Sequence, residues 1–295
     1  MIAIDWGTSS FRAFRLDAGQ IIDRIPAGPG ILAIAPTAFA ETLRTAIAPW
    51  LQAGERTILM AGMVGSRQGW VEAPYLACPA NPQSLAAAAI RIPFDGADLR
   101  LIPGLSLTAG DTPEVMRGEE VQVAGVLDRT GPDALICLPG THAKWVTLRA
   151  GQITGFTTHM TGEAFAALRH HTILGRLMHD TPTDPAFQQA AFQQGVDRAG
   201  RAGGLLHHLF GVRTLGLFDR LAPEHAASYL SGLLIGHEIH AMAPREPVNL
   251  VGAPALCALY ALAITMAGGK PVILDEDAAA SGLALLAQHI DWTTP

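Results

Sequence analysis

The two halves of the chain open on the same local pattern, and this internal repeat constrains the fold more than any other feature. The first half begins with an apolar run over 1–4, a Gly7-Thr8-Ser9 turn and a second run over 11–16. The second half has such runs at 134–138 and 144–148, joined by a Pro-Gly-Thr-His turn. Short apolar runs on either side of a tight turn are typical of paired strands. The repeat therefore predicts two similar subdomains, each beginning with a strand, a turn and a returning strand.

A shared tetrapeptide supports the same repeat. Ala-Gly-Gln-Ile occurs at 18–21 and at 150–153, at nearly the same distance from the Gly-Thr turn of its half. We therefore expect a third strand to begin at the tetrapeptide in both halves. Gly131-Pro132-Asp133 precedes the second copy and is the strongest chain break in the sequence. The predicted domains are residues 1–131 and 132–295, with the last helix free to pack back on the first domain.

Strands and helices alternate through the rest of the chain, which predicts an α/β protein. Further strands are expected over 57–61, 99–105, 248–251 and 271–274, and helices over 38–51, 82–90, 163–177, 184–201, 228–242 and 278–289. Another helix is expected after Asp111, carrying Arg117-Gly118-Glu119-Glu120 and ending near Asp128. The uncharged run over 251–269 is long enough to span a membrane. Gly252 and Pro254 at its start favour a buried helix instead.

The composition limits the partners and the compartment. Of the 295 residues 49% are hydrophobic, so the chain can bury a large core. The formal net charge of −6 disfavours nucleic acid as a partner. The cysteines lack C-x-x-C spacing and no basic segment precedes the first apolar run, so we expect a reduced, cytoplasmic protein without a membrane segment. A monomer and a homodimer are both compatible with the sequence.

The familiar nucleotide-binding motifs are absent, so turns of small residues are the candidate nucleotide-binding sites. The sequence has neither G-x-x-x-x-G-K-[ST] nor a G-x-G-x-x-G after a strand. A Gly-Thr-Ser turn presents backbone N–H groups and hydroxyls to an anion. Two such turns can hold the phosphates of a nucleotide, with Mg²⁺ on Asp5, and a third turn at Gly252 can receive adenosine. An ordinary hairpin with an aspartate in its turn explains a single copy equally well.

These turns and the strands that return from them contain the candidate ATP- and phosphate-binding residues. A solvated strand face is an equal alternative for Arg12 and Lys144. The full set is Gly7, Thr8, Ser9, Arg12, Gly140, Thr141, His142, Lys144, Gly252 and Ala253. The histidines form no known metal motif, because Ala241 stands where the sequence Gly236-His237-Glu238-Ile239-His240 would need a histidine for H-E-x-x-H.

Six segments that follow one another along the chain resemble a known family. They are AIDWGTSSFRAF at 3–14, MAGMVGSRQGWVEAPYL at 60–76, VMRGEE at 115–120, LPGTHAKWV at 138–146, MTGEAFAALRHH at 160–171 and YLSGLLIGHE at 229–238. Together they resemble the 2-dehydro-3-deoxygalactonokinase family of the sugar kinase, heat-shock chaperone and actin superfamily. The resemblance implies a two-domain, actin-like ATPase fold of the ribonuclease H-like type, with an ATP cleft between the domains. Residues 179–226 are assigned no role.

The resemblance also implies an activity. It implies a kinase that uses ATP and Mg²⁺ to phosphorylate 2-dehydro-3-deoxy-D-galactonate on its terminal (6-) hydroxyl, giving 2-dehydro-3-deoxy-6-phosphogalactonate in D-galactonate and galactose catabolism. Two alternatives stay open. One is a kinase for another small sugar or sugar acid, such as 2-dehydro-3-deoxygluconate, and the other is a non-catalytic, nucleotide-binding regulator of the same superfamily.

A base that accepts the proton of the attacking hydroxyl is expected in such a kinase. Asp111 is the first candidate, because it follows an expected strand and opens an expected helix, similar to the catalytic aspartate of hexokinase-like enzymes. Gly110 stands where those enzymes have an asparagine, and Glu119 is the reserve candidate. The alternatives are a helix N-cap for Asp111 and a surface charge for Glu119.

The substrate is expected among small residues, an aromatic side chain and a cation that meets its carboxylate. A tight turn and a core tryptophan are the alternatives for the loop over 62–66 and for Trp70. Three arginines, Arg67, Arg117 and Arg169, are candidates for the carboxylate and are not ranked by the sequence. Glu163 resembles the glutamate with which hexokinases reach the sugar. The substrate-binding set is Gly62, Met63, Val64, Gly65, Ser66, Trp70, Arg117, Glu163 and Arg169.

Overall fold

The computed structural model describes residues 1–179, 185–274 and 277–292. The chain forms two compact units, and neither is continuous in sequence. The first comprises residues 1–134, 146–157 and 275–295, and the second comprises 135–145 and 158–274. The chain therefore leaves and re-enters the first unit after the Gly-Pro-Asp break, instead of dividing once at that break.

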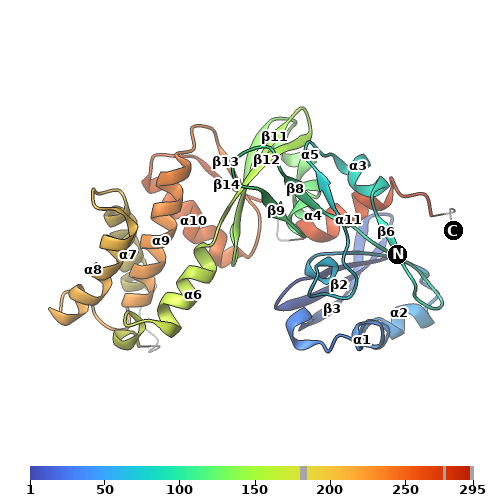
Figure 1. The fold of residues 1–295 in the computed structure, drawn as a ribbon, viewed down its shortest axis with the longest axis horizontal. Helices are drawn as coiled ribbons and strands as arrows, with labels where there is room; N and C mark the ends of the chain where they lie inside the picture. The colour runs from blue at the N-terminus through green and yellow to red at the C-terminus, as the bar shows by residue number, and fades with distance from the viewer. Residues whose placement is uncertain (180–184, 275–276, 293–295) are drawn as a thin grey trace. The chain divides into compact units, whose positions relative to one another are not determined.

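A six-stranded sheet forms the centre of the first unit (Figure 1). Its order is β3-β2-β1-β4-β7-β6, with β1, β2 and β3 antiparallel and β1, β4 and β7 parallel. The strands are β1 (Ile2–Trp6), β2 (Ser10–Asp17), β3 (Gln20–Pro29), β4 (Thr57–Ala61), β6 (Ile90–Ile92) and β7 (Asp98–Leu101). Because β1 and β4 are parallel neighbours, their carboxyl ends lie at one edge, which brings Asp5 next to the turn after β4.

The second sheet has the order β12-β11-β10-β13-β14. Counted along each half of the chain, its first four positions hold the third, second, first and fourth strands, as in the first sheet, and β10, β13 and β14 are again parallel. Its strands are β10 (Ala134–Leu138), β11 (Ala143–Arg149), β12 (Gln152–His159), β13 (Val248–Leu250) and β14 (Pro271–Ile273). The predicted internal repeat is confirmed at the level of topology.

The shared tetrapeptide has a geometric reason. Ala18 and Gly19 have φ angles of 46° and 81°, and Ala150 and Gly151 have 49° and 73°. Two successive residues at positive φ define the type I′ turn, whose twist matches that of the strands on either side. Each copy therefore forms the same two-residue hairpin, between β2 and β3 in the first half and between β11 and β12 in the second.

Helices and a small second sheet complete the first unit. The helices are α1 (Phe39–Ala46), α2 (Ala48–Gln52), α3 (Pro82–Ala87), α4 (Glu119–Ala124), α5 (Leu127–Thr130) and α11 (Ala278–Ala287), with 3-10 turns at Ile31–Ala33 and Met63–Gly65. The small sheet is β5 (Tyr75–Ala77), β8 (Gly104–Leu107) and β9 (Glu114–Met116). The last helix, α11, packs tightly on α4, since a Cβ at Gly282 would lie 1.9 Å from the Val121 carbonyl oxygen.

The second unit is mostly helical outside its sheet. Its helices are α6 (Thr161–His171), α7 (Pro185–Ala199), α8 (Gly204–Leu217), α9 (Ala226–Met242) and α10 (Pro254–Met266), with a 3-10 turn at Gly175–Leu177. α9 lies between two hydrophobic clusters, one against the sheet and one against α7 and α8. Gly232 allows α7 to approach α9, because a Cβ there would lie 2.0 Å from the Phe192 carbonyl oxygen. No helix among the described residues has the length and hydropathy that a membrane span requires.

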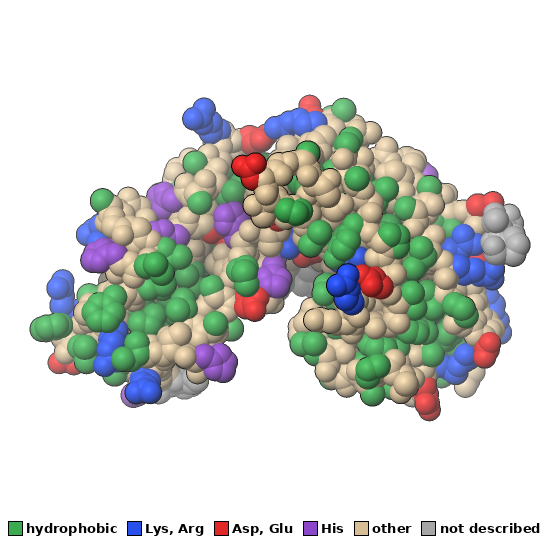
Figure 2. All heavy atoms as spheres, in the orientation of Figure 1, with side chains coloured by type: hydrophobic (Ala, Val, Ile, Leu, Met, Phe, Trp, Pro, Cys, Tyr) green, Lys and Arg blue, Asp and Glu red, His purple; other side chains and the backbone are tan. Residues whose placement is uncertain are grey.

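The helix α8 lies in the stretch to which the sequence assigned no role. Its His208 is fully buried and lies within hydrogen-bond distance of His237 on α9, with Nδ1 and Nε2 3.0 Å apart. Its opposite side is apolar and exposed: Leu206 is 84% exposed and Phe210 is 58% exposed. Figure 2 shows hydrophobic side chains gathered over this part of the second unit.

Five sequence expectations are wrong in their boundaries, and prolines explain three of them. The helix expected over 163–177 ends at His171, and only a 3-10 turn at Gly175–Leu177 follows. The helix expected over 38–51 breaks at Ile47, because Pro49 has no N–H to donate within a continuous helix. The strand expected over 99–105 is divided at Pro103 into β7 and β8, which belong to different sheets. The helix expected to follow Asp111 begins only at Glu119, as α4, because Pro113 disfavours helical geometry at the residue before it, and β9 forms first. The helix expected over 82–90 ends at Ala87, and β6 begins at Ile90.

Candidate functional site

Asp5 lies at the carboxyl end of β1 and is only 8% exposed. It faces Arg12 across the β1–β2 pair, and the Arg12 guanidinium donates a hydrogen bond to its Oδ2. Burial raises the pKa of Asp5, while the charge and hydrogen bond of Arg12 oppose that shift. Arg12 also keeps a buried Nε without a hydrogen-bond partner. The predicted metal ligand and one predicted phosphate contact therefore form an ion pair at the turn that Gly7, Thr8 and Ser9 make.

Two glycines bring a second acidic group toward Asp5. A Cβ at Gly62 would lie 3.1 Å from Asp5 Oδ1, and a Cβ at Gly118 would lie 3.3 Å from the Gly62 Cα. Both glycines have positive φ, at 100° and 109°, which side chains rarely allow. Glu119 follows Gly118 directly and is the first residue of α4. The loop after β4 and the start of α4 therefore meet beside Asp5.

Two neighbouring glutamates at the start of α4 have different environments. Glu119 is partly exposed, and its Oε2 accepts a hydrogen bond from the Arg117 backbone N–H at 3.0 Å. Glu120 is fully buried and accepts from the Gly118 N–H at 2.8 Å. Burial and the nearby Glu119 charge raise the pKa of Glu120 to about 8. Glu120 is thus held in its protonated form at neutral pH, while Glu119 is the carboxylate that solvent can reach.

Asp111 is exposed in the irregular segment between β8 and β9, and the helix that it was expected to open begins only at Glu119, as α4. The geometric reason for choosing Asp111 as base is therefore wrong, and the strand–acid–helix arrangement occurs at Glu119 instead.

The loop predicted to line the substrate pocket divides between core and surface. Val64 is fully buried in the hydrophobic core, so its side chain cannot line a pocket without unfolding the loop. Trp70 stacks on Phe39 with ring centroids 6.4 Å apart, as the core alternative expected. Gly62, Met63, Gly65 and Ser66 remain beside the start of α4 as candidates.

The three candidate arginines have different surroundings. Arg67 lies at the surface, its side chain 87% exposed and paired with Glu72. Arg169 lies on α6 in the second unit, where it lines a cavity. Arg117 is 7% exposed, its Nη2 donates to the Ala73 carbonyl at 2.8 Å, and its guanidinium lies 4.3 Å from the Tyr75 ring centroid.

The Gly-Thr turn of the second unit lies against the start of α6. The Glu163 N–H donates to the Thr141 carbonyl at 2.9 Å, and a Cβ at Gly162 would lie 2.4 Å from the Gly140 carbonyl oxygen. The side chains of His142 and Glu163, each about half exposed, pair with one another. A helix N-terminus beside a turn of small residues favours an anion.

The third predicted turn lies next to the same Gly-Thr turn. Gly252 has φ of 149°, and a Cβ there would lie 3.5 Å from the Pro139 carbonyl oxygen. Ala253 follows as the N-cap of α10. Lys144, on β11, is 5% exposed. The structure therefore brings the candidates of the second half together within one unit.

A buried carboxylate that the sequence did not indicate holds these elements in place. Glu238, on α9, is 3% exposed and accepts hydrogen bonds from Trp145 Nε1 and Tyr260 OH, both at 2.7 Å, and from the Thr161 hydroxyl. These donors come from β11, α10 and the first residue of α6. Burial, with the Glu238 carboxylate beside it, raises the pKa of Tyr260. The one sequence signal for Glu238 is its position next to His237, in the segment that was compared with H-E-x-x-H.

Replacing Glu238 by alanine is expected to lower the free energy of unfolding by about 3–5 kcal/mol, because it leaves three buried donors unpaired. Thermal and urea unfolding measure the loss. Alanine at Glu41, which is exposed on α1, is the matched control and should change stability by less than about 0.5 kcal/mol. Equal stability of the two variants would contradict the role of Glu238.

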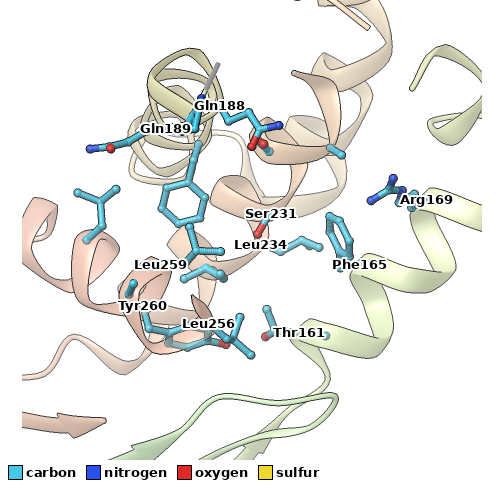
Figure 3. A pocket seen from close by; sticks show the side chains of 18 of the residues that line it. Thr161, Phe165, Arg169, Gln188, Gln189, Ser231, Leu234, Leu256, Leu259 and Tyr260 are labelled. Carbon is cyan, nitrogen blue, oxygen red and sulfur yellow. The ribbon is translucent and has the colours of Figure 1, made fainter. Parts of the chain in front are cut away.

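A cavity of about 810 Å³ lies beside the Gly-Thr turn in the second unit. Gly140, Thr161 and Gly162 form one part of its wall, Phe165 and Arg169 of α6 form another, and α7, α9 and α10 supply most of the rest. Figure 3 shows Leu234, Leu256, Leu259 and the Tyr260 ring on its apolar side, and Gln188, Gln189 and Ser231 as its polar groups. The mixture of apolar walls and a few polar groups is typical of pockets for small organic ligands.

Among the described residues, no group of three or more histidine, cysteine, aspartate or glutamate side chains forms a cage that could hold a metal ion. Mg²⁺ that arrives on a polyphosphate needs only one or two carboxylates and keeps several waters. Asp5 fits that second arrangement, since it is a single buried carboxylate at a turn of backbone N–H groups.

The buried Glu120 predicts a pH dependence of stability. Its pKa of about 8 lies above the ordinary value of 4.5, so the folded state holds a proton that the unfolded state releases. Its contribution to stability is complete below pH 4.5 and is lost as the pH rises through 8. Glu120→Gln is expected to remove this fall, so the variant gains stability relative to wild type between pH 6 and 9 by urea unfolding. Parallel pH profiles for the two proteins would refute this.

Comparisons with known proteins agree with the sequence and the topology. A family model described as 2-keto-3-deoxy-galactonokinase matches residues 5–286. The chain is 38% identical to a probable 2-dehydro-3-deoxygalactonokinase of Rhizobium meliloti, over 98% of this chain and 96% of that protein. It is 34% identical to the 2-dehydro-3-deoxygalactonokinase of Escherichia coli, over 90% of each.

The fold is also found in solved structures. A crystal structure of a putative 2-dehydro-3-deoxygalactonokinase from Sinorhizobium meliloti superposes with a TM-score of 0.87 at 36% identity, covering 99% of each chain. The ADPNP-bound activator of a dehydratase from Clostridium difficile shares the fold alone, with a TM-score of 0.56 at 12% identity over 98% of this chain and 95% of that one. The predicted α/β, two-domain, actin-like ATPase fold is confirmed. The chain belongs to the 2-keto-3-deoxy-galactonokinase family of ATP-dependent kinases.

Proposed function

We propose that this chain transfers the γ-phosphoryl group of ATP to the terminal (6-) hydroxyl of 2-dehydro-3-deoxy-D-galactonate. The product is 2-dehydro-3-deoxy-6-phosphogalactonate. The observation that carries the proposal is the meeting of Asp5, Gly62 and Glu119 at one edge of the first sheet, in a chain of this kinase family. Such a reaction needs charge neutralisation at the phosphates and a base at the acceptor, and this edge holds a carboxylate for each task.

The second unit supplies the nucleotide contacts in this proposal. The Gly140-Thr141 turn and the start of α6 bind phosphate oxygens through backbone N–H groups. The cavity beside them accommodates adenosine, with Gly252 and Ala253 at the start of α10. Lys144 and His142 carry the nitrogen groups nearest the turn in sequence that can donate hydrogen bonds to phosphate, and we assign them to phosphate.

The first unit supplies the remaining phosphate contacts and the metal ligand. Gly7, Thr8 and Ser9 bind phosphate, and Arg12 contributes its charge. Asp5 holds Mg²⁺, directly or through a water, and the ion would neutralise charge on the β- and γ-phosphates. Because Arg12 pairs with Asp5 in the structure, we propose that Arg12 turns from Asp5 toward phosphate when the nucleotide binds.

Glu119 is the proposed base, and Asp111 is the second candidate. Glu119 is reachable by solvent at the start of α4 and lies one residue from the contact between Gly118 and Gly62. The protonated Glu120 beside it does not compete for the role. We assign Glu163 to the pairing with His142 at the nucleotide turn instead of to the sugar.

A coupled kinase assay with purified protein tests the function. ATP hydrolysis or ADP release is measured without acceptor, with 2-dehydro-3-deoxy-D-galactonate, with 2-dehydro-3-deoxygluconate and with neutral hexoses. The expected result is ADP release only with the sugar acids, and fastest with the galactonate derivative. A higher kcat/KM for the gluconate epimer would change the substrate, and nucleotide binding without any transfer would favour the non-catalytic regulator. A homodimer stays a prediction, which light scattering on the purified chain tests.

A further inference from the structure

Arg117 is a buried cation of the first unit whose charge acts on Glu120 but whose guanidinium forms no salt bridge among the described residues. It is 7% exposed. Its Nη2 donates to the Ala73 carbonyl, but its Nε and Nη1 are buried without any hydrogen-bond partner. Buried polar groups are nearly always satisfied, and a buried charge without a partner is costly. The unpaired donors therefore indicate a ligand that supplies the missing acceptors.

A second unpaired group lies in the loop that approaches the guanidinium. The Ser66 Oγ is also buried without a hydrogen-bond partner. Its neighbour Gly65 faces the guanidinium, and a Cβ there would lie 3.0 Å from Arg117 Nη1 and 3.1 Å from Leu101 Cδ2. Glycine at this position therefore lets the loop that carries Ser66 approach the guanidinium more closely than a side chain would allow.

The guanidinium lies just beneath the surface. The Tyr75 ring covers it, with its centroid 4.3 Å from the Arg117 Cζ, and Tyr75 is itself 43% exposed. Stacking of this kind orients an arginine without using its hydrogen-bond donors. A ligand reaches the cation by a small movement of the Tyr75 ring or of the loop at Gly65 and Ser66. The group that fits a fixed guanidinium and a hydroxyl is a carboxylate.

We infer that Arg117 and Ser66 bind the carboxylate of the sugar-acid substrate. The inference rests on the proposed function, and it ranks Arg117 above Arg67 and Arg169. Arg67 is paired with Glu72 at the surface, and Arg169 lies in the other unit beside the cavity assigned to adenosine. The site then selects acids over neutral sugars, because a neutral substrate leaves the buried cation unpaired.

The test compares the sugar acid with its neutral counterpart. The neutral compound is the 3-deoxyhex-2-ulose in which the carboxylate of 2-dehydro-3-deoxy-D-galactonate is replaced by hydroxymethyl. Arg117→Gln is expected to raise KM for the acid by roughly 10- to 100-fold and to leave KM for the hexulose within about 3-fold. Ser66→Ala, which removes no hydrogen bond present in the structure, is expected to raise KM for the acid alone by about 3- to 10-fold.

Arg67→Gln is the matched control, since it also removes one arginine charge, from the loop that carries Ser66, and is expected to leave both KM values unchanged. Thermal unfolding without ligand checks that each variant folds. Equal rises in KM for both compounds, or unchanged KM in both the Arg117 and Ser66 variants, would mean that a buried water satisfies Arg117, and would overturn the inference. A selective effect of Arg169→Gln would overturn it in favour of that residue.

Calorimetric titration of the sugar acid without ATP separates this inference from the proposed function. Binding to wild type that Arg117→Gln weakens, with no phosphoryl transfer in the kinase assay, would uphold the carboxylate site and refute the kinase. Phosphoryl transfer at the wild-type rate together with undiminished binding of the acid in Arg117→Gln would uphold the kinase and refute the carboxylate site. No binding of any sugar acid to the wild type, with or without nucleotide, would overturn both.

Discussion

Replacing Glu119 by glutamine is expected to lower kcat by about 10²–10⁴-fold, because the attacking hydroxyl loses the group that accepts its proton. Asparagine at Asp111 is expected to leave kcat within about 3-fold, as an exposed substitution away from the reacting groups does. Steady-state kinetics with 2-dehydro-3-deoxy-D-galactonate and ATP measure both effects. The informative quantity is the ratio of the two kcat values, because each replacement removes one acidic group and keeps the shape of the side chain.

Two controls make the Glu119 result specific. Glutamine retains an oxygen that can accept the Arg117 backbone N–H, so α4 is expected to begin at the same residue and the Tm to change little. Calorimetric binding of an ATP analogue is expected to match wild type, since Glu119 makes no proposed nucleotide contact. A fully active Glu119→Gln together with an inactive Asp111→Asn would reverse the assignment and require the loop between β8 and β9 to move toward the substrate.

The hairpins could be predicted from the sequence because their determinants are local. Ala-Gly at 18–19 and at 150–151 requires only the positive φ values of one turn, and the apolar runs beside it require only a buried sheet. The same locality identified Gly140-Thr141 and Gly252 as turns. Their meeting on one edge follows from parallel β10 and β13, which the alternation of strands and helices already predicts.

The catalytic assignment could not be predicted in the same way. Asp111 and Glu119 stand eight positions apart, and each is followed by residues that can form a helix. Thr112-Pro113 weighs against a helix at Asp111, but that signal is weaker than the close approach of Gly118 to Gly62, which exists only after β4 and α4 have packed. Gly62 and Gly118 are far apart in the sequence, so the contact that favours Glu119 could not be recognised from the sequence.

Long-range burial explains the other omissions. Glu238 is surrounded in sequence by the histidines of α9, whereas its partners Trp145, Thr161 and Tyr260 come from three other elements. The sequence could not rank the three arginines, because the exposure and the ion pairing that distinguish them are set by the folded structure. Arg117 differs from Arg67 only in that the small sheet and the Gly65 turn enclose it.

Replacing Asp5 by asparagine is expected to lower kcat/KM for Mg·ATP by about 10²–10³-fold, because the buried carboxylate that would hold the ion loses its charge. The activity that remains is expected to require a higher Mg²⁺ concentration than wild type. Asparagine keeps the size of the side chain beside Gly62, so the turn itself should be unchanged. Activity measured against Mg²⁺ at fixed ATP gives both quantities.

Arg12→Gln is the matched control, because it breaks the same ion pair from the other side and keeps the carboxylate. It is expected to weaken ATP binding while the Mg²⁺ concentration for half-maximal activity stays near that of wild type. Calorimetry adds a readout that does not depend on turnover: Mg²⁺ should strengthen ADP binding to wild type and to Arg12→Gln, and fail to do so for Asp5→Asn. If all three proteins respond equally to Mg²⁺, Asp5 serves the fold through Arg12 and the ion is bound by the nucleotide alone.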